Sequence, residues 1–280
     1  MNEIDFSKIY SYSKIELFNK CKQQYYFNYL DPVIAPIKKQ FIKPRDYKTK
    51  GSAVHGAITL FYYLPVSART FDNLKRCLIQ AWFSEIDIYK KPPLGQAGGF
   101  KDISHERESY LDCLKLLYKF FKIEKENPSF FYIPTKKIRE SFCDYQEMIK
   151  PINEELSISG KFDRVDKLEN GNLRIVDFKT GKTKNGFSQL EFYKLLAELN
   201  FNAKVDQVSY YYLNNREIDN FDVSKIKTEE IKNKVLEKIN IIKKAREFPP
   251  NPTKLCSHCD FKEICPAFVR HSGLRRAKPA

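Results

Sequence analysis

The residues best suited to chemistry are an aspartate and a lysine two positions apart, Asp177 and Lys179, in the stretch LRIVDFKTG. This stretch predicts a β-strand, on which positions i and i+2 share one face about 7 Å apart. A third acid, Asp163, lies in the preceding stretch ELSISGKFDRVDKL. Two carboxylates and a lysine on one face suit a Mg²⁺ or Mn²⁺ site for phosphodiester hydrolysis. An ordinary charged strand face is the competing interpretation, which the short D-x-K pattern alone favours.

The turn between these two strands decides whether Asp163 joins the other two residues. A two-residue Asn170-Gly171 turn would pair position 163 with 178 and direct Asp163 to the wrong face. A three-residue loop with Gly171 in the left-handed conformation would pair 163 with 177 and bring both carboxylates to one face. We predict the second register or an equivalent bulge.

The residues after the strand resemble the end of a nucleotide-binding loop. Gly181 is followed by Lys182 and Thr183, but Val176 stands where the phosphate-binding motif requires its first glycine. This difference excludes an ATPase, and the chain is too short for a helicase.

A second group of residues is suited to binding metal through sulfur. Three cysteines have the spacing C-x₂-C-x₅-C, namely Cys256, Cys259 and Cys265. Such thiolates hold either zinc or an iron–sulfur cluster, and a fourth ligand decides between them. Cys21 lies far upstream, while His258 and His271 are the alternatives for zinc. His258 lies between two ligands on a tight knuckle, so we expect it to point away.

The stretches around these residues predict the elements that hold them. Apolar spacing and the capping pair Ser13/Glu16 predict a helix near the N-terminal end, and the pair Ser188/Glu191 predicts another that begins at position 188. The helices are expected over 11–30, 51–63, 188–199 and 228–248, with a largely helical stretch over 71–127. Strands are expected within 136–149, 155–168, 173–181 and 205–213. Cys77, Cys113 and Cys143 lack a partner spacing and are expected to be buried small hydrophobic residues.

Composition narrows the class of partner. The chain has 280 residues, 42% of them hydrophobic, and a formal net charge of +14. This apolar content supports a packed core, and the positive excess predicts a polyanionic partner, first of all nucleic acid. No apolar run reaches the roughly 18 residues of a membrane helix, so no membrane partner is expected. The acidic N-terminal stretch lacks the features of a signal peptide, which predicts a cytoplasmic protein with reduced thiols or metal ligands.

Four motifs resemble those of PD-(D/E)xK nucleases. GSAVHG, GKFDRVD, IVDFKTGK and QLEFY occur in the order of these motifs in RecB-like exonucleases, the AddB nuclease domain and the CRISPR-associated adaptation nucleases. The resemblance covers about residues 8–268. It implies that His55, Asp163 and Asp177 ligate metal and that Asp163, Asp177 and Lys179 are catalytic. It also places Gln189 and Tyr193 on a helix that helps hold DNA, while Asp177 replaces the glutamate of many relatives.

The same resemblance favours iron at the cysteines. In the AddB-like and CRISPR-associated families an N-terminal cysteine joins the C-terminal triplet around a 4Fe-4S cluster, and Cys21 matches that position, two turns into the first helix. The cluster would connect the two ends of the chain, so its loss would be coupled to unfolding. Zinc and free core thiols remain the alternatives.

The resulting fold expectation is an α/β protein with a PD-(D/E)xK, restriction-endonuclease-like core. A mixed sheet flanked by helices would carry a helical insertion and a C-terminal iron–sulfur lobe. The expected parts are an N-terminal helical part (1–55), the helical insertion (56–130), the nuclease core (131–215), a long helix with a cysteine-rich cluster lobe (216–270) and a basic tail (271–280).

The expected function is a metal-dependent DNA nuclease. Aromatic-rich helices offer stacking surfaces for unpaired bases, which favours single-stranded or frayed DNA as the substrate, although most aromatic residues are expected in the core. The resemblance to RecB-like exonucleases implies an exonuclease. The resemblance places it in DNA repair and recombination or in CRISPR adaptation, with a helicase or CRISPR adaptation proteins as partners. The alternative is a non-catalytic DNA-binding scaffold subunit of such a complex, against which the complete set of acids and lysine argues.

Overall fold

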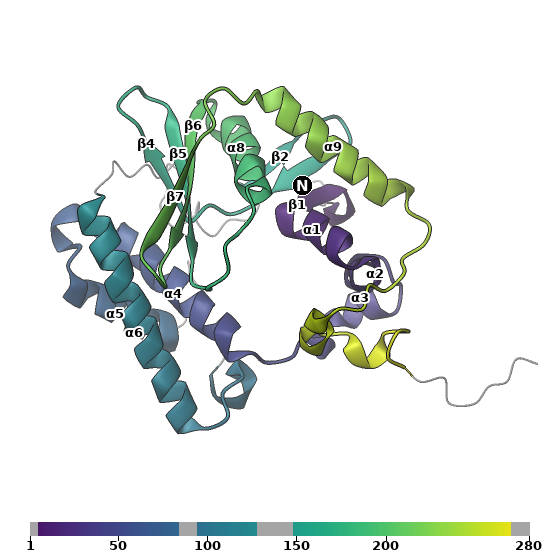
Figure 1. The fold of residues 1–280 in the computed structure, drawn as a ribbon, viewed down its shortest axis with the longest axis horizontal. Coiled ribbons are helices and arrows are strands. Elements are labelled where there is room, and N and C mark those ends of the chain that lie inside the picture. The colour runs from purple at the N-terminus through teal and green to yellow at the C-terminus, as the bar shows by residue number, and fades with distance from the viewer. Residues whose placement is uncertain (1–4, 84–93, 128–147, 270–280) are drawn as a thin grey trace, which may run out of the picture. The chain divides into compact units, whose positions relative to one another are not determined.

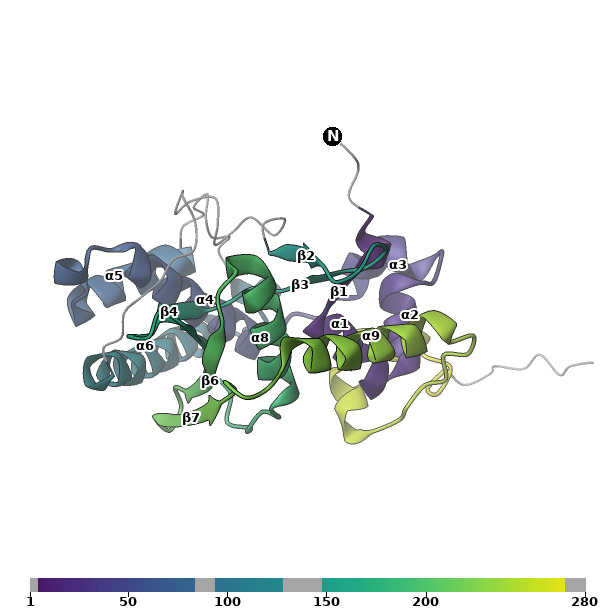
Figure 2. The ribbon, with the colours of Figure 1, turned by 90° about the horizontal axis from the view of Figure 1, so that it is seen from above.

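The computed structural model describes residues 5–83, 94–127 and 148–269 (Figures 1 and 2). The chain divides into two compact units, here called the sheet unit (Met1–Ile9 and Pro44–Leu236) and the cysteine unit (Tyr10–Lys43 and Glu237–Ala280). Within the described ranges, none of the helices has both the length and the apolar character needed to cross a membrane.

The sheet unit is built on a four-stranded mixed sheet in the order β4-β5-β6-β7. Its strands are β4 (Arg164–Lys167), β5 (Leu173–Lys179), β6 (Val205–Tyr212) and β7 (Glu217–Asp222). The inner pair β5 and β6 is parallel, and each outer strand is antiparallel to its neighbour. Five of the seven residues of β5 are buried, as expected for a central strand covered on both faces. The sequence analysis did not predict β7, because its alternation is dominated by polar residues.

The β4–β5 hairpin has the register predicted from its turn. Arg164 pairs with Val176, so continuation of the ladder sets position 163 opposite 177. Gly171 has φ +85°, the left-handed conformation that this loop requires. The prediction that both carboxylates come to one side of the hairpin's open end is therefore confirmed.

The stretch expected to be one strand over 155–168 is two strands in different sheets. Residues Ser157–Ser159 form β3, which pairs with β2 (Ile149–Pro151), and the chain then leaves that sheet to enter β4. Gly160 lies at this break, where a Cβ atom would stand 2.8 Å from the Leu196 side chain. Close packing against the following helix ends the strand, and Asp163 consequently lies in the connection that leads into β4. Residues 136–147, also expected to be extended, lie outside the described ranges.

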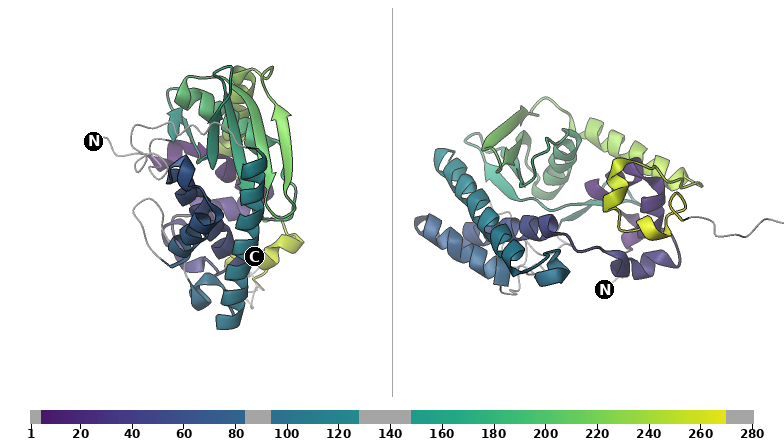
Figure 3. Two further views of the ribbon diagram at one scale, coloured as in Figure 1. Left: turned by 90° about the vertical axis from the view of Figure 1, so that its left-hand side faces the viewer. Right: turned by 60° about the horizontal axis from the view of Figure 1, so that its bottom comes forward.

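Three helices cover one face of the sheet (Figure 3). They are α4 (Asp46–Tyr63), α5 (Phe71–Phe83) and α6 (Ile103–Glu126). Ala53 and Ala57 on α4 are fully buried, and such small side chains allow a helix to lie close to a sheet. The three helices share one hydrophobic core with the sheet residues Val176, Phe178, Tyr211 and Leu213.

Helix α8 (Ser188–Phe201) contacts the other face of β5 and β6. The sheet is thus flanked by helices on both faces, as predicted (Figure 2). Ser188 is the first helical residue rather than the predicted cap, because the chain preceding it already turns at Phe187. Helix α9 (Thr228–Lys244) begins at the predicted residue and ends four residues before the predicted end at 248, with acidic residues in its first turn and basic residues in its last. It carries the chain from the sheet unit into the cysteine unit.

The cysteine unit begins with a helix that is interrupted at Cys21. The predicted continuous helix over 11–30 is wrong: α1 (Tyr12–Lys20) and α2 (Lys22–Tyr29) are separated by Cys21 in an extended conformation. Ser11, not Ser13, caps α1 by accepting a hydrogen bond from the Lys14 N–H.

Residues near the C-terminal end satisfy backbone groups at this interruption. Asn251 Nδ2 donates to the Lys20 carbonyl, and the Gln23 N–H donates to the Pro249 carbonyl. The ring of Phe248 stacks on Tyr26 with centroids 5.1 Å apart. These tertiary contacts compensate for the helical hydrogen bonds that are lost, which explains why local sequence did not reveal the break.

The remaining elements are short. They are β1 (Ile9–Ser11), α3 (Ile34–Ile37) and the 3₁₀ helices Phe6–Lys8, Lys38–Phe41, Val66–Ala68, Gly95–Gly98, Lys254–His258 and Lys262–Ile264. The Gly95–Gly98 turn lies between α5 and α6, within the stretch over 71–127 that was expected to be largely helical.

Candidate active site

A cavity of about 370 Å³ opens on the sheet unit beside the carboxyl end of β5. It is lined by three acids or bases from separate elements, by the lysine of the D-x-K pattern and by the loop that follows it. The lining residues are His55, Lys161, Asp163, Asp177, Phe178, Lys179, Thr180, Gly181, Thr183, Asn185 and Tyr193. The structure thus brings together five of the six residues predicted for a nuclease site, namely His55, Asp163, Asp177, Lys179 and Tyr193.

His55 and Asp163 are in direct contact within this cavity. His55 Nδ1 lies 3.1 Å from Asp163 Oδ1, and the other oxygen of Asp163 accepts a hydrogen bond from the Phe178 N–H at 2.9 Å. Helix α4 supplies the histidine, and its buried small residues bring it close to the sheet. The second contact attaches Asp163 to β5, the strand that carries Asp177, so the same strand positions both carboxylates of the site.

Asp177 and Lys179 form an ion pair along β5. Lys179 Nζ lies 2.7 Å from Asp177 Oδ2, as expected for side chains on the same face of a strand. Asp177 is 7% exposed and Lys179 is 19% exposed. Among the described residues, Asp177 Oδ2 is a buried oxygen that lacks a partner in hydrogen-bond geometry, despite the short approach of the lysine.

The electrostatics of the site separate its two carboxyl groups. Burial and the nearby Asp163 carboxylate together raise the pKa of Asp177 to about 6, against the opposing effect of Lys179. Burial would also raise the pKa of Asp163, but His55 and the Phe178 N–H outweigh it and lower that pKa. Burial alone would lower the pKa of His55, yet contact with Asp163 raises it. Asp163 and Asp177 therefore repel each other, and His55 and Lys179 compensate for their negative charge only in part.

Gln189 connects the lysine to the helix that flanks the site. Its Oε1 accepts a hydrogen bond from Lys179 Nζ at 2.9 Å, and its Nε2 donates to the Tyr193 hydroxyl at 3.1 Å. The i, i+4 spacing of Gln189 and Tyr193 on α8 places both on one face of that helix. Gln189 contacts Lys179 but does not line the cavity, whereas Tyr193 does.

Tyr210 on β6 is a site residue that the sequence analysis missed. It pairs with Asp177 in the parallel ladder, and its ring centroid lies 5.0 Å from Lys179 Nζ. Its hydroxyl donates to the Gly186 carbonyl at 3.0 Å. Only the register between β5 and β6 reveals this position, since the stretch SYYYL presents three tyrosines in a row.

The loop after Lys179 was also missed as part of the site. Thr180, Thr183 and Asn185 line the cavity, and the Asn185 N–H donates to the Tyr212 hydroxyl. A polar loop with glycines directly after the D-x-K pattern is the signal that could have identified it. The sequence analysis had considered only Gly181, Lys182 and Thr183 of this loop, as an incomplete nucleotide-binding motif.

The residues present fit a divalent cation, although they are not gathered around one. In the described part of the chain, no three His, Cys, Asp or Glu side chains are close enough together to constitute a metal site. The mutual repulsion of Asp177 and Asp163, two carboxylates that face one cavity, is nevertheless what a cation would relieve. An imidazole and two carboxylates also suit Mn²⁺, and the carboxylates suit Mg²⁺.

The four cysteines singled out from the sequence line one cavity in the cysteine unit. This cavity has a volume of about 280 Å³, and Cys21, Cys256, Cys259 and Cys265 all contribute to its walls. Burial raises the pKa of Cys259, and the thiols of the other three raise it further. The interruption at Cys21 places this residue outside regular helix at the cavity wall.

The other cysteines differ from this group. Cys77 and Cys113 are buried, as predicted. Burial raises the pKa of Cys77 to about 11 and that of Cys113 to about 12. Cys143 lies outside the described residues, as does His271. His258 is exposed and does not belong to the lining of the cysteine cavity.

Comparison with known proteins adds a family match to this geometry. The family model described as the PD-(D/E)XK nuclease superfamily matches residues 9–266. The sequence matches none of the curated proteins. Among solved structures, the crystal structure of SSO0001 is similar over 96% of this chain and 90% of that chain, at 12% identity and a TM-score of 0.39.

Proposed function

Because the chain belongs to the PD-(D/E)XK nuclease superfamily, we propose that it is a metal-dependent deoxyribonuclease that hydrolyses phosphodiester bonds. The observation that carries this proposal is the convergence of His55, Asp163, Asp177 and Lys179 on one cavity. Three separate elements supply these residues, so the convergence is a product of the fold and not of sequence proximity.

His55, Asp163 and Asp177 would hold the metal ion. When bound, a Mg²⁺ or Mn²⁺ ion stabilises the negative charge that develops on the scissile phosphate. Asp163 is held for this role by the Phe178 N–H, and Asp177 is held by its ion pair with Lys179. The acidic centre of a protein with net charge +14 would otherwise repel the phosphate.

Lys179 would position the attacking water and donate to the phosphate oxygens. Its ammonium group is held between Asp177 Oδ2 at 2.7 Å and Gln189 Oε1 at 2.9 Å. The Tyr210 ring lies against the same ammonium group. These contacts restrict a long side chain to one region of the cavity, which is the orientation effect that hydrolysis needs.

Tyr193 would contact DNA from α8, and Gln189 would contribute to DNA binding indirectly by holding the Lys179 ammonium group and the Tyr193 hydroxyl. Tyr193 lines the cavity and presents an aromatic ring beside the metal ligands, where an unpaired base can stack. This supports single-stranded or frayed DNA as the substrate, and the resemblance to RecB-like exonucleases favours an exonuclease. On the sequence resemblance alone, we place this activity in DNA repair and recombination or in CRISPR adaptation, with a helicase or adaptation proteins as partners.

The four-cysteine cavity would hold a 4Fe-4S cluster. Its support is the gathering of Cys21 with the C-terminal triplet, in the order of the families that the sequence resembles. The cavity also has apolar walls, including Phe27 and Phe261, which suit a cluster shielded from water. The ligands come from both ends of the cysteine unit, so the cluster would stabilise that unit.

A nuclease assay tests the proposed function. Purified protein is incubated with end-labelled single- and double-stranded DNA, blocked at either end, in Mg²⁺ or Mn²⁺. We expect cleavage by the wild type, loss of cleavage but retained DNA binding in Lys179→Ala, and normal cleavage in Lys75→Ala, a lysine on α5. Full activity of Lys179→Ala would contradict the mechanism, and DNA binding without cleavage by the wild type would favour a scaffold subunit.

A further inference from the structure

We propose that Arg164 is a positioning residue that holds α4 against β4 and so keeps His55 beside Asp163. Arg164 directly follows Asp163 in the chain, but it takes no part in the cavity described above. The inference rests on the proposed function, because the pair that Arg164 would position is the one assigned to bind metal.

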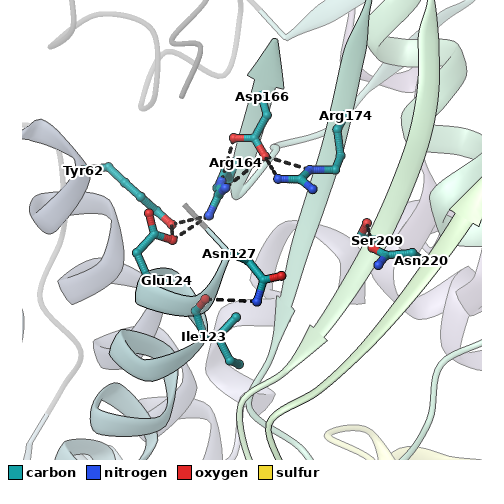
Figure 4. Close-up of polar contacts among 9 residues, drawn as sticks. All are labelled: Tyr62, Ile123, Glu124, Asn127, Arg164, Asp166, Arg174, Ser209 and Asn220. Atoms are coloured by element: carbon teal, nitrogen blue, oxygen red, sulfur yellow. Dashed lines mark hydrogen bonds and ion pairs between the residues drawn. The ribbon is translucent and has the colours of Figure 1, made fainter. Parts of the chain in front are cut away.

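Arg164 is the centre of a buried charged network (Figure 4). Its side chain is 1% exposed and donates to both oxygens of Asp166, at 2.7 and 3.0 Å. Its Nη1 also donates to Glu124 Oε2 at 2.6 Å and to the Tyr62 hydroxyl at 2.9 Å. Tyr62 in turn donates to Glu124 at 2.8 Å. One guanidinium group thereby joins β4 to helices α4 and α6.

The network also reaches the strand that carries Asp177 and Lys179. Arg174 on β5 donates to Asp166 Oδ2 through Nε at 2.9 Å and through Nη2 at 2.7 Å. Arg174 and Asp166 are paired residues of the β4–β5 ladder. Asp166 therefore lies between two guanidinium groups, which compensates for the burial of its charge.

Tyr62 links the buried network to the candidate active site, because it lies on the same helix as His55. His55 and Tyr62 are seven residues apart, two helical turns, so they lie on the same side of α4. His55 contacts Asp163 and Tyr62 contacts the next residue, Arg164. Helix α4 is thus attached at two points to the start of β4, one at the metal-binding pair and one in the buried network.

A guanidinium group is required at this position for a geometric reason. Its planar fork donates two parallel bonds to Asp166 while a second edge reaches Glu124 and Tyr62. Lysine has a single ammonium group and cannot span the three partners in the same way. Removal of the charge would leave Glu124 with less compensation in a site where it is 17% exposed.

Mn²⁺ binding tests this role separately from folding. We expect Arg164→Met to weaken Mn²⁺ binding measured by titration calorimetry at least tenfold and to lower kcat similarly, as outer residues of metal sites commonly do. KM for DNA should stay within about twofold. Arg164→Lys should restore part of the loss. The matched control is Leu74→Ala on α5, a fully buried change outside the network, which should lower the melting temperature without weakening Mn²⁺ binding.

The outcomes separate this inference from the proposed function. Mn²⁺ binding by Arg164→Met that equals binding by Leu74→Ala would overturn the positioning role, whereas a wild type that neither binds Mn²⁺ nor cleaves DNA would overturn the proposed function. If Arg164→Met does not fold, Tyr62→Phe tests the positioning role instead, because it removes only the hydroxyl that contacts Arg164 and Glu124. At least threefold weaker Mn²⁺ binding with an unchanged circular dichroism spectrum supports the role, and wild-type binding refutes it.

Discussion

His55 Nδ1 lies 3.1 Å from Asp163 Oδ1, although 108 positions separate the two residues in the chain. The contact joins helix α4 to the connection that enters β4, and it brings an imidazole to the edge of a pair of carboxylates. Contact with Asp163 raises the pKa of His55 against the effect of burial. The site is therefore an acidic pair that is partly neutralised by His55 and Lys179.

The metal-free protein should lose stability as the pH rises through the range in which Asp177 ionises. Burial and Asp163 raise the pKa of Asp177 from 3.8 to about 6. The folded state thus binds this proton more tightly than the unfolded state, so the stabilising contribution is full below about pH 4 and is lost as the pH rises through about 6. The loss should be about 3 kcal/mol, measured by chemical denaturation at several pH values.

Mn²⁺ should reverse this loss, because the ionised carboxylates bind the cation. We expect the increase in melting temperature on addition of Mn²⁺ to be larger at about pH 7.5 than at about pH 5. Asp177→Asn should remove both the pH dependence and the Mn²⁺ effect. An undiminished Mn²⁺ effect in Asp177→Asn would show that Asp177 is not a ligand.

Gln189→Ala should lower kcat about tenfold with little change in KM for DNA. Gln189 accepts the hydrogen bond from Lys179 Nζ, and its loss would free the lysine to adopt other rotamers. Tyr193→Phe, which removes only the hydroxyl that Gln189 donates to, should have a smaller effect. Steady-state kinetics of both variants check this. A rise in KM alone for Gln189→Ala would instead indicate that Gln189 acts by binding DNA.

Cys256→Ser should abolish iron binding and lower the stability of the protein. Anaerobically purified wild type should be brown, with broad absorbance near about 400 nm, and iron analysis should detect the cluster. Cys113→Ala is the matched control, because this buried thiol lies outside the cysteine cavity and should leave the iron content unchanged. A colourless protein with stoichiometric zinc would overturn the cluster assignment in favour of a zinc site.

Gly160→Ala should destabilise the protein by about 1–3 kcal/mol, the usual cost of overpacking. Its added Cβ atom would stand 2.8 Å from Leu196 Cδ2, so the buried Leu196 side chain, α8 or the connection into β4 must shift. Thermal denaturation measures the cost. Gly181→Ala has open space around its Cβ and should be far milder, and Leu196→Ala should partly rescue Gly160→Ala. Equal effects at the two glycines would rule out this clash.

The sequence identified the chemically competent residues and the register of one hairpin. Both depend on local rules: alternation along a strand sets Asp177 and Lys179 on one face, and Gly171 permits the loop that sets position 163 opposite 177. The spacing of the cysteine triplet is equally local. Such features are encoded within a few residues, so they can be deduced without knowledge of the rest of the fold.

Only the tertiary structure decided which distant residues complete the sites. Tyr210 joins Lys179 through the parallel pairing of β5 with β6, which no local pattern specifies. The interruption at Cys21 depends on hydrogen bonds from residues more than 220 positions away. Arg164 could be seen in the sequence as a neighbour of Asp163, but its partners Glu124 and Tyr62 come from helices whose packing buries all three charges or dipoles together. Long-range packing, rather than local propensity, determines these contacts, because their free energy arises only when the separate elements exclude water from one another.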